Sequence, residues 1–145
     1  MTSASEHIST IVFLCVANSA RSQMAEGLAR ATAPSGWRVY SAGTRPNMVH
    51  PLAIMVMREI DIDISHHRSK AIEDIPIHEA DVVVTLCSEE VCPTINSDTQ
   101  HLRWPLPDPA TEGDMIRYQL DVFRSVRDDI RQKLTSFWDT QPAKR

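Results

Sequence analysis

The sequence predicts an α/β fold with a mainly parallel sheet and helices on both faces. Short apolar stretches alternate with stretches of helical period along most of the chain, which is the order typical of such folds. Residues 80–86 are apolar on both faces, as in a covered parallel strand. Two cysteines, Cys15 and Cys87, follow predicted strands directly. Ligands bind beyond the carboxyl ends of strands in these sheets, so both thiols are expected at one crevice.

Length and composition predict one domain, residues 1–145, with a sizeable core. The 42% apolar content is ordinary, and the net charge of −4 argues against nucleic acid as a partner. No apolar stretch approaches the ~20 residues that span a bilayer, and no export signal is evident, so we expect a cytoplasmic protein without membrane contact. Its three cysteines are then expected to be reduced at rest, with a catalytic or redox purpose.

In the first half of the chain, strands and helices alternate. Residues 11–14 form a predicted buried strand, and residues 22–32 carry a helical apolar stripe that the Pro34–Gly36 stretch ends. Residues 37–42 form a short strand, which Gly43 stops. A largely buried helix is predicted over residues 50–60, with Pro51 in its first turn.

The second half begins with a less regular stretch. The alternating isoleucines of residues 60–64 are interpreted as a helix end and connector, and Ser69 is expected to cap a short helix that reaches Asp74. Residues 80–86 give the clearest strand, and residues 101–106 an edge strand limited by Pro105. A long amphipathic helix is predicted over residues 114–138.

The loop between the first strand and the first helix has the residues of an anion-binding loop. Its N–H groups converge, and the helix dipole adds partial positive charge. We expect this cradle to favour the thiolate of Cys15, and Arg21 to grip two oxygens as a planar fork. The combination suits attack on a tetrahedral oxyanion, although a buried thiol beside a helix-capping arginine is the structural alternative. The anion-binding residues are expected to be Val16, Ala17, Asn18, Ser19, Ala20, Arg21 and Ser22.

Cys87 and Cys92 lie five positions apart. Five residues of α-helix separate Cα atoms by roughly 8.6 Å, whereas a disulfide needs roughly 4.4–6.8 Å, so these thiols can pair only in a non-helical segment. The spacing matches no usual zinc pattern, and we predict no metal site and no cofactor. Two buried thiols without a redox role are the alternative.

Asp108 lies between Pro107 and Pro109 in the loop after the predicted edge strand. Two prolines stiffen the backbone around this carboxyl group. A rigidly presented acid at the carboxyl edge of the sheet suits general acid catalysis, whereas a turn or capping role is the commoner one for Asp beside Pro. The nearby Cys15–Arg21 loop favours the catalytic interpretation.

Several motifs occur in order: residues 15–22, Ser-Ala-Gly-Thr at 41–44, Thr-Leu-Cys at 85–87, Cys-Pro at 92–93 and Asp-Pro-Ala at 108–110. Together they resemble the arsenate reductases built on the low-molecular-weight protein tyrosine phosphatase fold, with the long last helix in the expected place. The resemblance implies a four-stranded parallel sheet with flanking helices, arsenate as substrate, and thioredoxin or a similar dithiol as partner.

The resemblance also implies a relay through Cys15, Cys87 and Cys92. Cys15 attacks arsenate held by the loop and by Arg21, and Asp108 protonates the leaving oxygen. Cys87 then attacks Cys15, arsenite leaves, and Cys92 resolves the disulfide for an external dithiol. The segment from Cys87 to Cys92 is shorter than in some relatives, which leaves the identity of the reductant open.

Two positions depart from the family pattern. Ala20 stands where members often carry a cysteine inside the loop. Some members bind a potassium ion near Asn18, Glu26 and Ser41, helped by an acidic residue after a His-x-Ser segment. This chain has Lys70 there, which argues against the ion and can replace its charge.

Two rival functions remain from the sequence. A protein tyrosine phosphatase would need only Cys15, Arg21 and Asp108, and would leave Cys87 and Cys92 unexplained; relatives of that kind usually have tyrosines after the Asp-Pro, where this chain has none. A non-enzymatic redox or oxyanion sensor would use a disulfide to alter binding of a partner protein. Sustained NADPH loss with arsenate, thioredoxin and its reductase favours the reductase.

Overall fold

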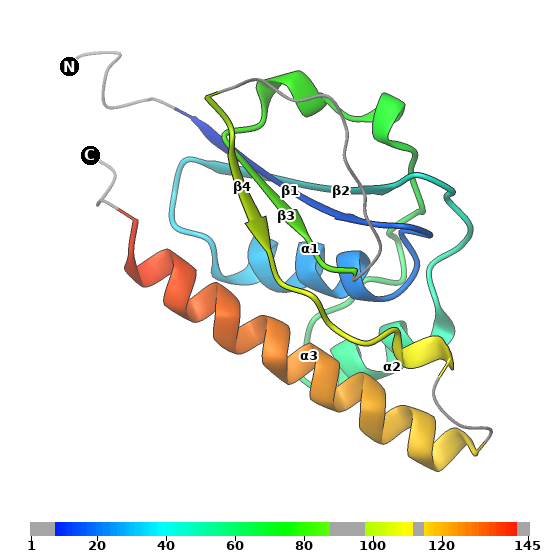
Figure 1. Cartoon of the computed structure of the whole chain (residues 1–145). Coiled ribbons are helices and arrows are strands. Elements are labelled where there is room, and N and C mark those ends of the chain that lie inside the picture. The colour runs from blue at the N-terminus through cyan, green and yellow to red at the C-terminus, as the bar shows by residue number, and fades with distance from the viewer. Residues whose placement is uncertain (1–7, 88–97, 112–114, 142–145) are drawn as a thin grey trace.

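The computed structural model describes residues 8–87, 98–111 and 115–141. Its centre is a four-stranded parallel sheet in the order β2-β1-β3-β4 (Figure 1). The prediction of a parallel four-stranded sheet is therefore confirmed. The strands are β1 (Ser9–Cys15), β2 (Trp37–Gly43), β3 (Val82–Thr85) and β4 (Gln100–Arg103).

Helices of different kinds cover the two faces of the sheet. The helices α1 (Arg21–Thr32), α2 (Pro51–Arg58) and α3 (Ile116–Asp139) pack together on one face. On the other face lie two short 3-10 helices, η2 (Ile72–Asp74) and η3 (Ile77–Glu79) (Figure 1). A further 3-10 helix, η4 (Pro109–Thr111), precedes α3.

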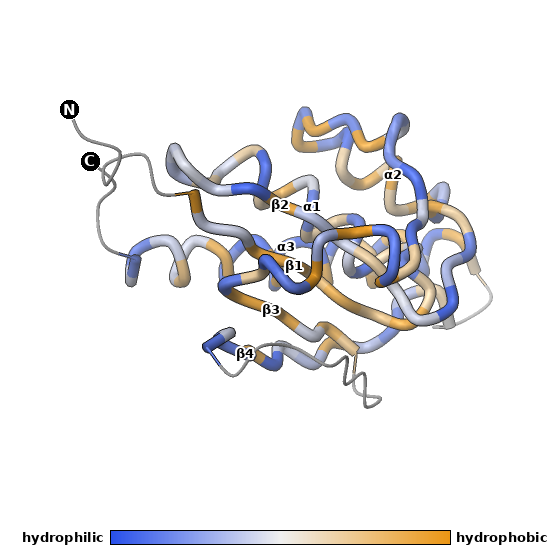
Figure 2. Tube along the Cα trace, turned by 90° about the horizontal axis from the view of Figure 1, so that it is seen from above, coloured by the Kyte–Doolittle hydropathy of each residue, from blue (hydrophilic) through white to orange (hydrophobic). Residues whose placement is uncertain are grey.

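Alternate residues of β1 build the two cores. Ile11 and Phe13 pack toward the three α-helices, and Val12 and Leu14 pack toward η2 and η3; all four are fully buried. Burial on both sides explains the continuous apolar run, and Figure 2 shows β1 and β3 as the hydrophobic centre of the sheet. Strand β4 lies at the edge and is mostly exposed, as predicted, although it ends at Arg103, before Pro105.

The start of each α-helix bears on the site. His50 caps α2 with its side chain, and Pro51 follows at the first position, as the sequence predicts. No side chain caps α1, whose preceding residue is Ala20, so its first N–H groups are left for another acceptor. Helix α3 is held to α2 by Arg127, which donates to the carbonyl of Val56 at 2.8 Å.

The expected role of Ser69 is wrong. The short helix begins only at Ile72, and the residue before it, Ala71, provides no side-chain cap. The Ser69 hydroxyl instead donates to the carbonyl of Ala17, 2.8 Å away, and accepts from the N–H of Asn47. A tertiary hydrogen bond to the loop after β1 thus replaces the local one. By contrast, residues 60–64 form the predicted connector, which places Ile64 in the core.

Within the described ranges, no helix combines the length and the apolar character needed to cross a membrane.

Candidate active site

Three of the predicted chemical residues lie at the carboxyl edge of the sheet. Cys15 is the last residue of β1 and pairs with Gly43 at the end of β2. Cys87 follows β3 by two residues, and the chain leading to Asp108 continues from the end of β4. Hydrogen bonds from Leu86 N to Leu14 O (3.0 Å) and from Leu106 N to Leu86 O (3.0 Å) hold the three strand ends together. The structure therefore brings these residues to one edge, as the sequence predicts.

The loop after Cys15 directs its carbonyl groups outward. The carbonyls of Val16, Ala17 and Ser19 accept hydrogen bonds from the N–H groups of Arg45, Asn47 and His50, at 2.8, 3.1 and 3.0 Å. The Asn18 carbonyl accepts from the side chain of Gln23, and the Ala20 carbonyl from the N–H of Met24 in α1.

Outward carbonyls imply inward N–H groups. Across a trans peptide, the C=O of one residue and the N–H of the next point in opposite directions, and the described residues contain no cis peptide. The N–H groups of residues 17–21 therefore face the centre of the loop, where the first turn of α1 adds its own. Such a ring binds an oxyanion with three or four oxygens.

Gly43 permits the close approach of β2 to this loop. A methyl group at Gly43 would press against the carbonyl oxygen of Val16, lie 2.9 Å from the amide nitrogen of Asn18, and lie 3.0 Å from the carbonyl oxygen of Cys15. All three contacts are with backbone, which has little room to yield. Asn18 itself has a left-handed conformation, with φ of 50°, which Asn tolerates better than most residues.

A directed chain of hydrogen bonds ends at the Cys15 sulfur. Asn18 uses both hydrogens of its Nδ2, one toward Ser22 Oγ at 2.8 Å and one toward Ser41 Oγ at 3.0 Å. Because Ser22 Oγ accepts from Asn18, its own hydrogen is free to point at Cys15 Sγ, 2.9 Å away. The Cys15 sulfur therefore lies against a buried hydroxyl that can donate a hydrogen bond to it.

The orientation of the Asn18 amide is set from its other side. Its Oδ1 accepts from the backbone N–H of Lys70 at 2.8 Å and from Gln23 Nε2 at 2.9 Å. Two N–H donors on one atom identify that atom as the oxygen, which settles which end of the amide faces Ser22 and Ser41. Asn18 is fully buried, so the whole set is shielded from water.

Gln23 extends this network to His67. Its Nε2 also donates to the carbonyl of Arg68 at 3.0 Å, so its Oε1 is the acceptor facing His67 Nδ1, 2.9 Å away. His67 therefore carries its hydrogen on Nδ1. Burial lowers the pKa of His67, and the nearby carboxylate of Glu26 opposes that shift.

The far end of the network is Glu26, whose Oε1 accepts from the hydroxyl of Ser41. Lys70 Nζ lies 3.4 Å from the same oxygen, and Arg30 Nη2 lies 2.8 Å from Oε2. A potassium ion here would need oxygen ligands that are not already occupied by N–H donors. Both Glu26 oxygens and Asn18 Oδ1 have cationic or N–H partners, so these residues do not fit the ion. Among the residues that the structure describes, no three His, Cys, Asp or Glu side chains gather as a metal site either.

Arg21 is the buried cation of the site. Its residue is 7% exposed, and its Nη1 donates to the carbonyl of Leu106 at 3.1 Å. Its Nη2 lies 3.8 Å from Asp108 Oδ2, so the guanidinium spans from the loop after β4 to the start of α1. It is not the solvated helix cap that was the alternative from sequence. A planar group fixed in this way can present its remaining N–H groups to two oxygens of an anion.

Asp108 makes the turn contact considered from sequence and also faces Arg21. Its Oδ1 accepts from the N–H of Ala110 at 3.0 Å, which is a turn bond, while its Oδ2 faces Arg21. The side chain is 41% exposed. His50, beyond it at the start of α2, stacks on Phe123 with ring centres 4.8 Å apart. Burial lowers the pKa of His50, and the charge of Asp108 raises it in part.

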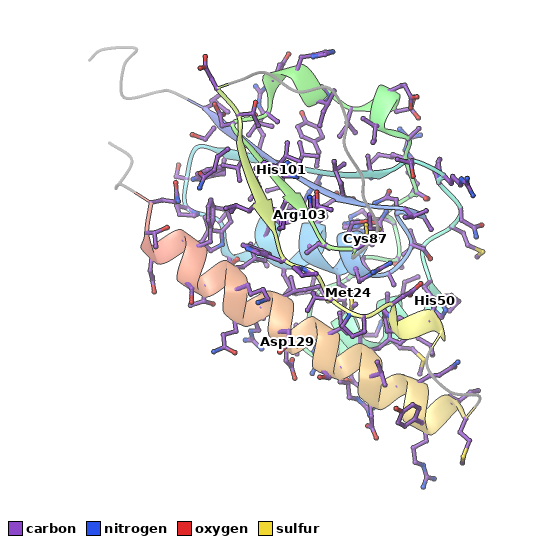
Figure 3. The ribbon with its side chains drawn as sticks, in the orientation of Figure 1. Met24, His50, Cys87, His101, Arg103 and Asp129 are labelled. Carbon is purple, nitrogen blue, oxygen red and sulfur yellow. The ribbon has the colours of Figure 1, made fainter. Side chains whose placement is uncertain are left out.

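Cys87 is buried, with 2% exposure, and belongs to the same packed cluster as Cys15. Neither of these two thiols is in a disulfide. Figure 3 shows Cys87 at the C-terminal end of β3, on the same side of the molecule as His50. Cys92 lies outside the described residues.

Sequence reasoning missed Gln23 and His67 as supports of the loop. No spacing signal could have identified them: Gln23 occupies an ordinary buried helical position, and His67 is 44 residues away from it along the chain. Gln23 and His67 come together only because the connection from α2 to β3 packs against the loop after Cys15 and the start of α1.

Comparison with known proteins gives the family. The model of the low molecular weight phosphotyrosine protein phosphatase family matches residues 10–144. Arsenate reductase 2 of Staphylococcus saprophyticus is 44% identical over 132 residues, which are 90% of this chain and 96% of that protein. An arsenate reductase of Staphylococcus aureus strain N315 is 41% identical over 130 residues, 88% of this chain and 95% of that protein.

Solved structures agree with this result. An arsenate reductase in the phosphate binding state superposes with a TM-score of 0.77 at 34% identity, over 91% of this chain and 98% of the other. A thioredoxin-dependent arsenate reductase of Corynebacterium glutamicum gives a TM-score of 0.71 at 29% identity, over 93% of this chain and 64% of the other. The resemblance drawn from the motifs is confirmed: the chain belongs to the low-molecular-weight phosphotyrosine protein phosphatase family.

Proposed function

We propose that the protein reduces arsenate to arsenite through a thiol relay. The observation that carries the proposal is the pair of buried, unbridged thiols, Cys15 and Cys87, packed in one cluster at neighbouring strand ends. A phosphatase needs only the first of them. The relatives named above are arsenate reductases, and one of them is named as thioredoxin-dependent.

In the first step, arsenate binds in the ring of N–H groups of residues 17–21, with two of its oxygens on Arg21. The geometry of the ring suits a tetrahedral anion and holds it against Cys15 Sγ. The thiolate forms a bond to arsenic, and one hydroxyl leaves as water after it takes a proton from Asp108. Arsenic is still in its oxidised state, now joined to Cys15.

The second step is the reduction. The Cys87 sulfur attacks Cys15 Sγ, the sulfur–arsenic bond breaks, and its electron pair stays on arsenic, which leaves as arsenite. Two thiols are thereby oxidised to a Cys15–Cys87 disulfide, which balances the two electrons gained by arsenic. Proximity within one buried cluster supports this exchange, because neither strand end has to travel far.

Cys92 is proposed as the resolving thiol. Its attack on Cys87 would free Cys15 and leave a Cys87–Cys92 disulfide, which thioredoxin or a similar dithiol of the cytoplasm reduces. Each cycle would thus consume one external dithiol and release one arsenite.

A coupled assay tests the proposal. Arsenate, thioredoxin, thioredoxin reductase and NADPH are mixed with the protein, and arsenite and NADPH loss are measured together. We expect sustained loss of one NADPH for each arsenite. With Cys92→Ser, about one arsenite per protein should appear before the reaction stalls as a Cys15–Cys87 disulfide, detected by mass spectrometry. Full multiple turnover by that variant would remove Cys92 from the relay.

Phosphatase activity is the second candidate, because Cys15, Arg21 and Asp108 alone provide a nucleophile, an anion clamp and an acid. Hydrolysis of an aryl phosphate without thiols, together with no arsenite formation, would favour it. Failure of both assays would leave a redox or oxyanion sensor.

A further inference from the structure

We infer that Lys70 is a positioning residue whose ammonium is a built-in cation for the network beneath Cys15. In this role it holds Glu26, and through Glu26 the hydrogen bonds that direct the Ser22 hydroxyl at the sulfur, without a monovalent metal ion. The inference rests on the proposed function in one respect, namely that Cys15 is the nucleophile.

Glu26 is buried, so its charge needs a partner. The side chain of this glutamate is 4% exposed, and a buried carboxylate is costly unless it is paired. Arg30 reaches one oxygen from a side chain that is 52% exposed. Lys70 reaches the other oxygen from a side chain only 15% exposed, so its charge is the less screened of the two.

Lys70 contacts the network at both of its ends. Its backbone N–H donates to Asn18 Oδ1 at 2.8 Å, and its Nζ lies 3.4 Å from Glu26 Oε1. Between these points run Asn18 Nδ2, the Ser41 hydroxyl and the Glu26 carboxylate. The hydrogen bonds therefore close into a ring that includes Lys70, entering at its backbone N–H and leaving at its Nζ.

Two further contacts fix Lys70 in this place. Its carbonyl accepts from the N–H of Gly43 at 2.9 Å, and its Nζ also donates to the carbonyl of Arg68 at 3.0 Å. An ammonium held by a carbonyl and a carboxylate can be displaced only if both bonds break. It lies against Glu26 Oε1, one of the oxygens that a metal ion here would use.

The ring of hydrogen bonds connects Lys70 to the hydrogen bond at the Cys15 sulfur. The Ser41 hydrogen is committed to Glu26, so Ser41 Oγ accepts from Asn18, and Asn18 in turn keeps its second hydrogen on Ser22. Removing the ammonium leaves the buried carboxylate with the more exposed Arg30 as its cationic partner. We therefore expect the ring to loosen and the hydrogen bond onto Cys15 to weaken.

The test compares Lys70→Met, Lys70→Arg and, as a matched control, Lys133→Met, which changes an exposed lysine on α3. The readout is the rate at which iodoacetamide alkylates Cys15 at pH 7, followed on the Cys15 peptide by mass spectrometry. The midpoint of thermal unfolding is measured alongside. Both are run in sodium, potassium and choline chloride at equal ionic strength. Neither readout needs arsenate turnover, so a failed relay would not affect them.

We expect Lys70→Met to slow alkylation about tenfold, the effect of roughly 1.4 kcal/mol at the sulfur, with Lys70→Arg within about threefold of the wild type and Lys133→Met unchanged. The wild type should give the same rate in all three salts. A wild-type rate in Lys70→Met overturns the inference, as does an arginine variant as slow as the methionine one. Acceleration of the wild type more than twofold by potassium over sodium also overturns it, and this arm stands even if Lys70→Met does not fold.

Discussion

The two halves of the site are held very differently. Around Cys15, buried side chains fill nearly every hydrogen-bonding position: Asn18 alone makes two donor and two acceptor contacts, and it is fully buried. Around Asp108, the side chain is 41% exposed, one oxygen makes a turn bond, and the other lies 3.8 Å from Arg21, beyond hydrogen-bond length.

This difference separates the attack from the proton transfer. The half with the nucleophile is organised before any anion arrives, so its hydrogen bonds need no rearrangement during attack. Asp108, the proposed acid, lies between two prolines with its Oδ2 facing Arg21, and it can adjust its position once an oxyanion is bound. A substitution in one half of the site should therefore change the step that this half performs, and the step performed by the other half can still be measured.

The largest effect is expected from Asp108→Asn, which tests whether the two halves of the site act separately. An amide cannot protonate the leaving oxygen, so the first step with arsenate should slow by about 10²–10⁴-fold. Alkylation of Cys15 by iodoacetamide needs no acid and should stay unchanged. Arsenite formed in a single turnover measures the rate of the first step, and the control is Asp129→Asn, which changes an exposed acid on α3 (Figure 3). An unchanged single-turnover rate would reduce Asp108 to a turn residue.

The next largest effect on rate is expected from a substitution that crowds the loop after Cys15. Gly43→Ala drives a methyl group into the backbone of the loop after Cys15, and a displacement on the order of 1 Å can cost about 10² in rate. We expect both the arsenate step and the alkylation of Cys15 to slow.

Gly27→Ala is the matched control for Gly43→Ala. Its new methyl group would lie 2.7 Å from Ile64 Cγ2 and 3.1 Å from Met57 Cε, the ends of side chains that can shift. The unfolding midpoint in urea should fall while Cys15 alkylation stays near the wild-type rate. Equal loss of reactivity in both variants would argue that general destabilisation, rather than loop geometry, is responsible.

A smaller change isolates one hydrogen bond. Ser22→Ala removes the hydroxyl 2.9 Å from Cys15 Sγ and should slow alkylation by up to about tenfold, because a hydrogen bond contributes roughly 0.5–1.5 kcal/mol. Ser22→Thr keeps the hydroxyl and should recover most of the rate. Rates for Ser22→Ala that match the wild type at pH 7 would show that the hydroxyl does not act on the sulfur.

The smallest expected effect concerns pH and His50. Burial lowers the pKa of His50 in the folded protein, so the unfolded chain takes up the proton first as the pH falls. Its contribution to the free energy of unfolding is complete above about pH 6.5, the unperturbed value, and is lost below it. His50 Nδ1 accepts from Leu52 N–H at 3.1 Å, and Asn also caps helices but does not titrate.

His50→Asn should therefore flatten the loss of stability between pH 7.5 and 5, measured by urea unfolding at each pH. Part of the slope should remain, because burial lowers the pKa of His67 as well. A slope identical to that of the wild type would mean that His50 has no part in the pH response.

The local sequence was enough to predict much of this protein. Continuous burial of β1 gave an apolar run that no exposed strand would carry, and the small polar residues after it indicated the loop. Cys15, Arg21 and Asp108 could be named because each stands beside a strand end or a helix start, where backbone geometry is a property of adjacent residues.

The tertiary structure alone decided how the nucleophile is supported. Ser41 meets Asn18 and Glu26 because β2 lies against β1, and Lys70 reaches Asn18 and Glu26 from a connection more than 40 residues further along the chain. Ser69, expected to cap a helix, bonds to the loop instead for the same reason. Hydrogen bonds between distant segments depend on how the chain packs, and packing leaves no period or spacing in the sequence.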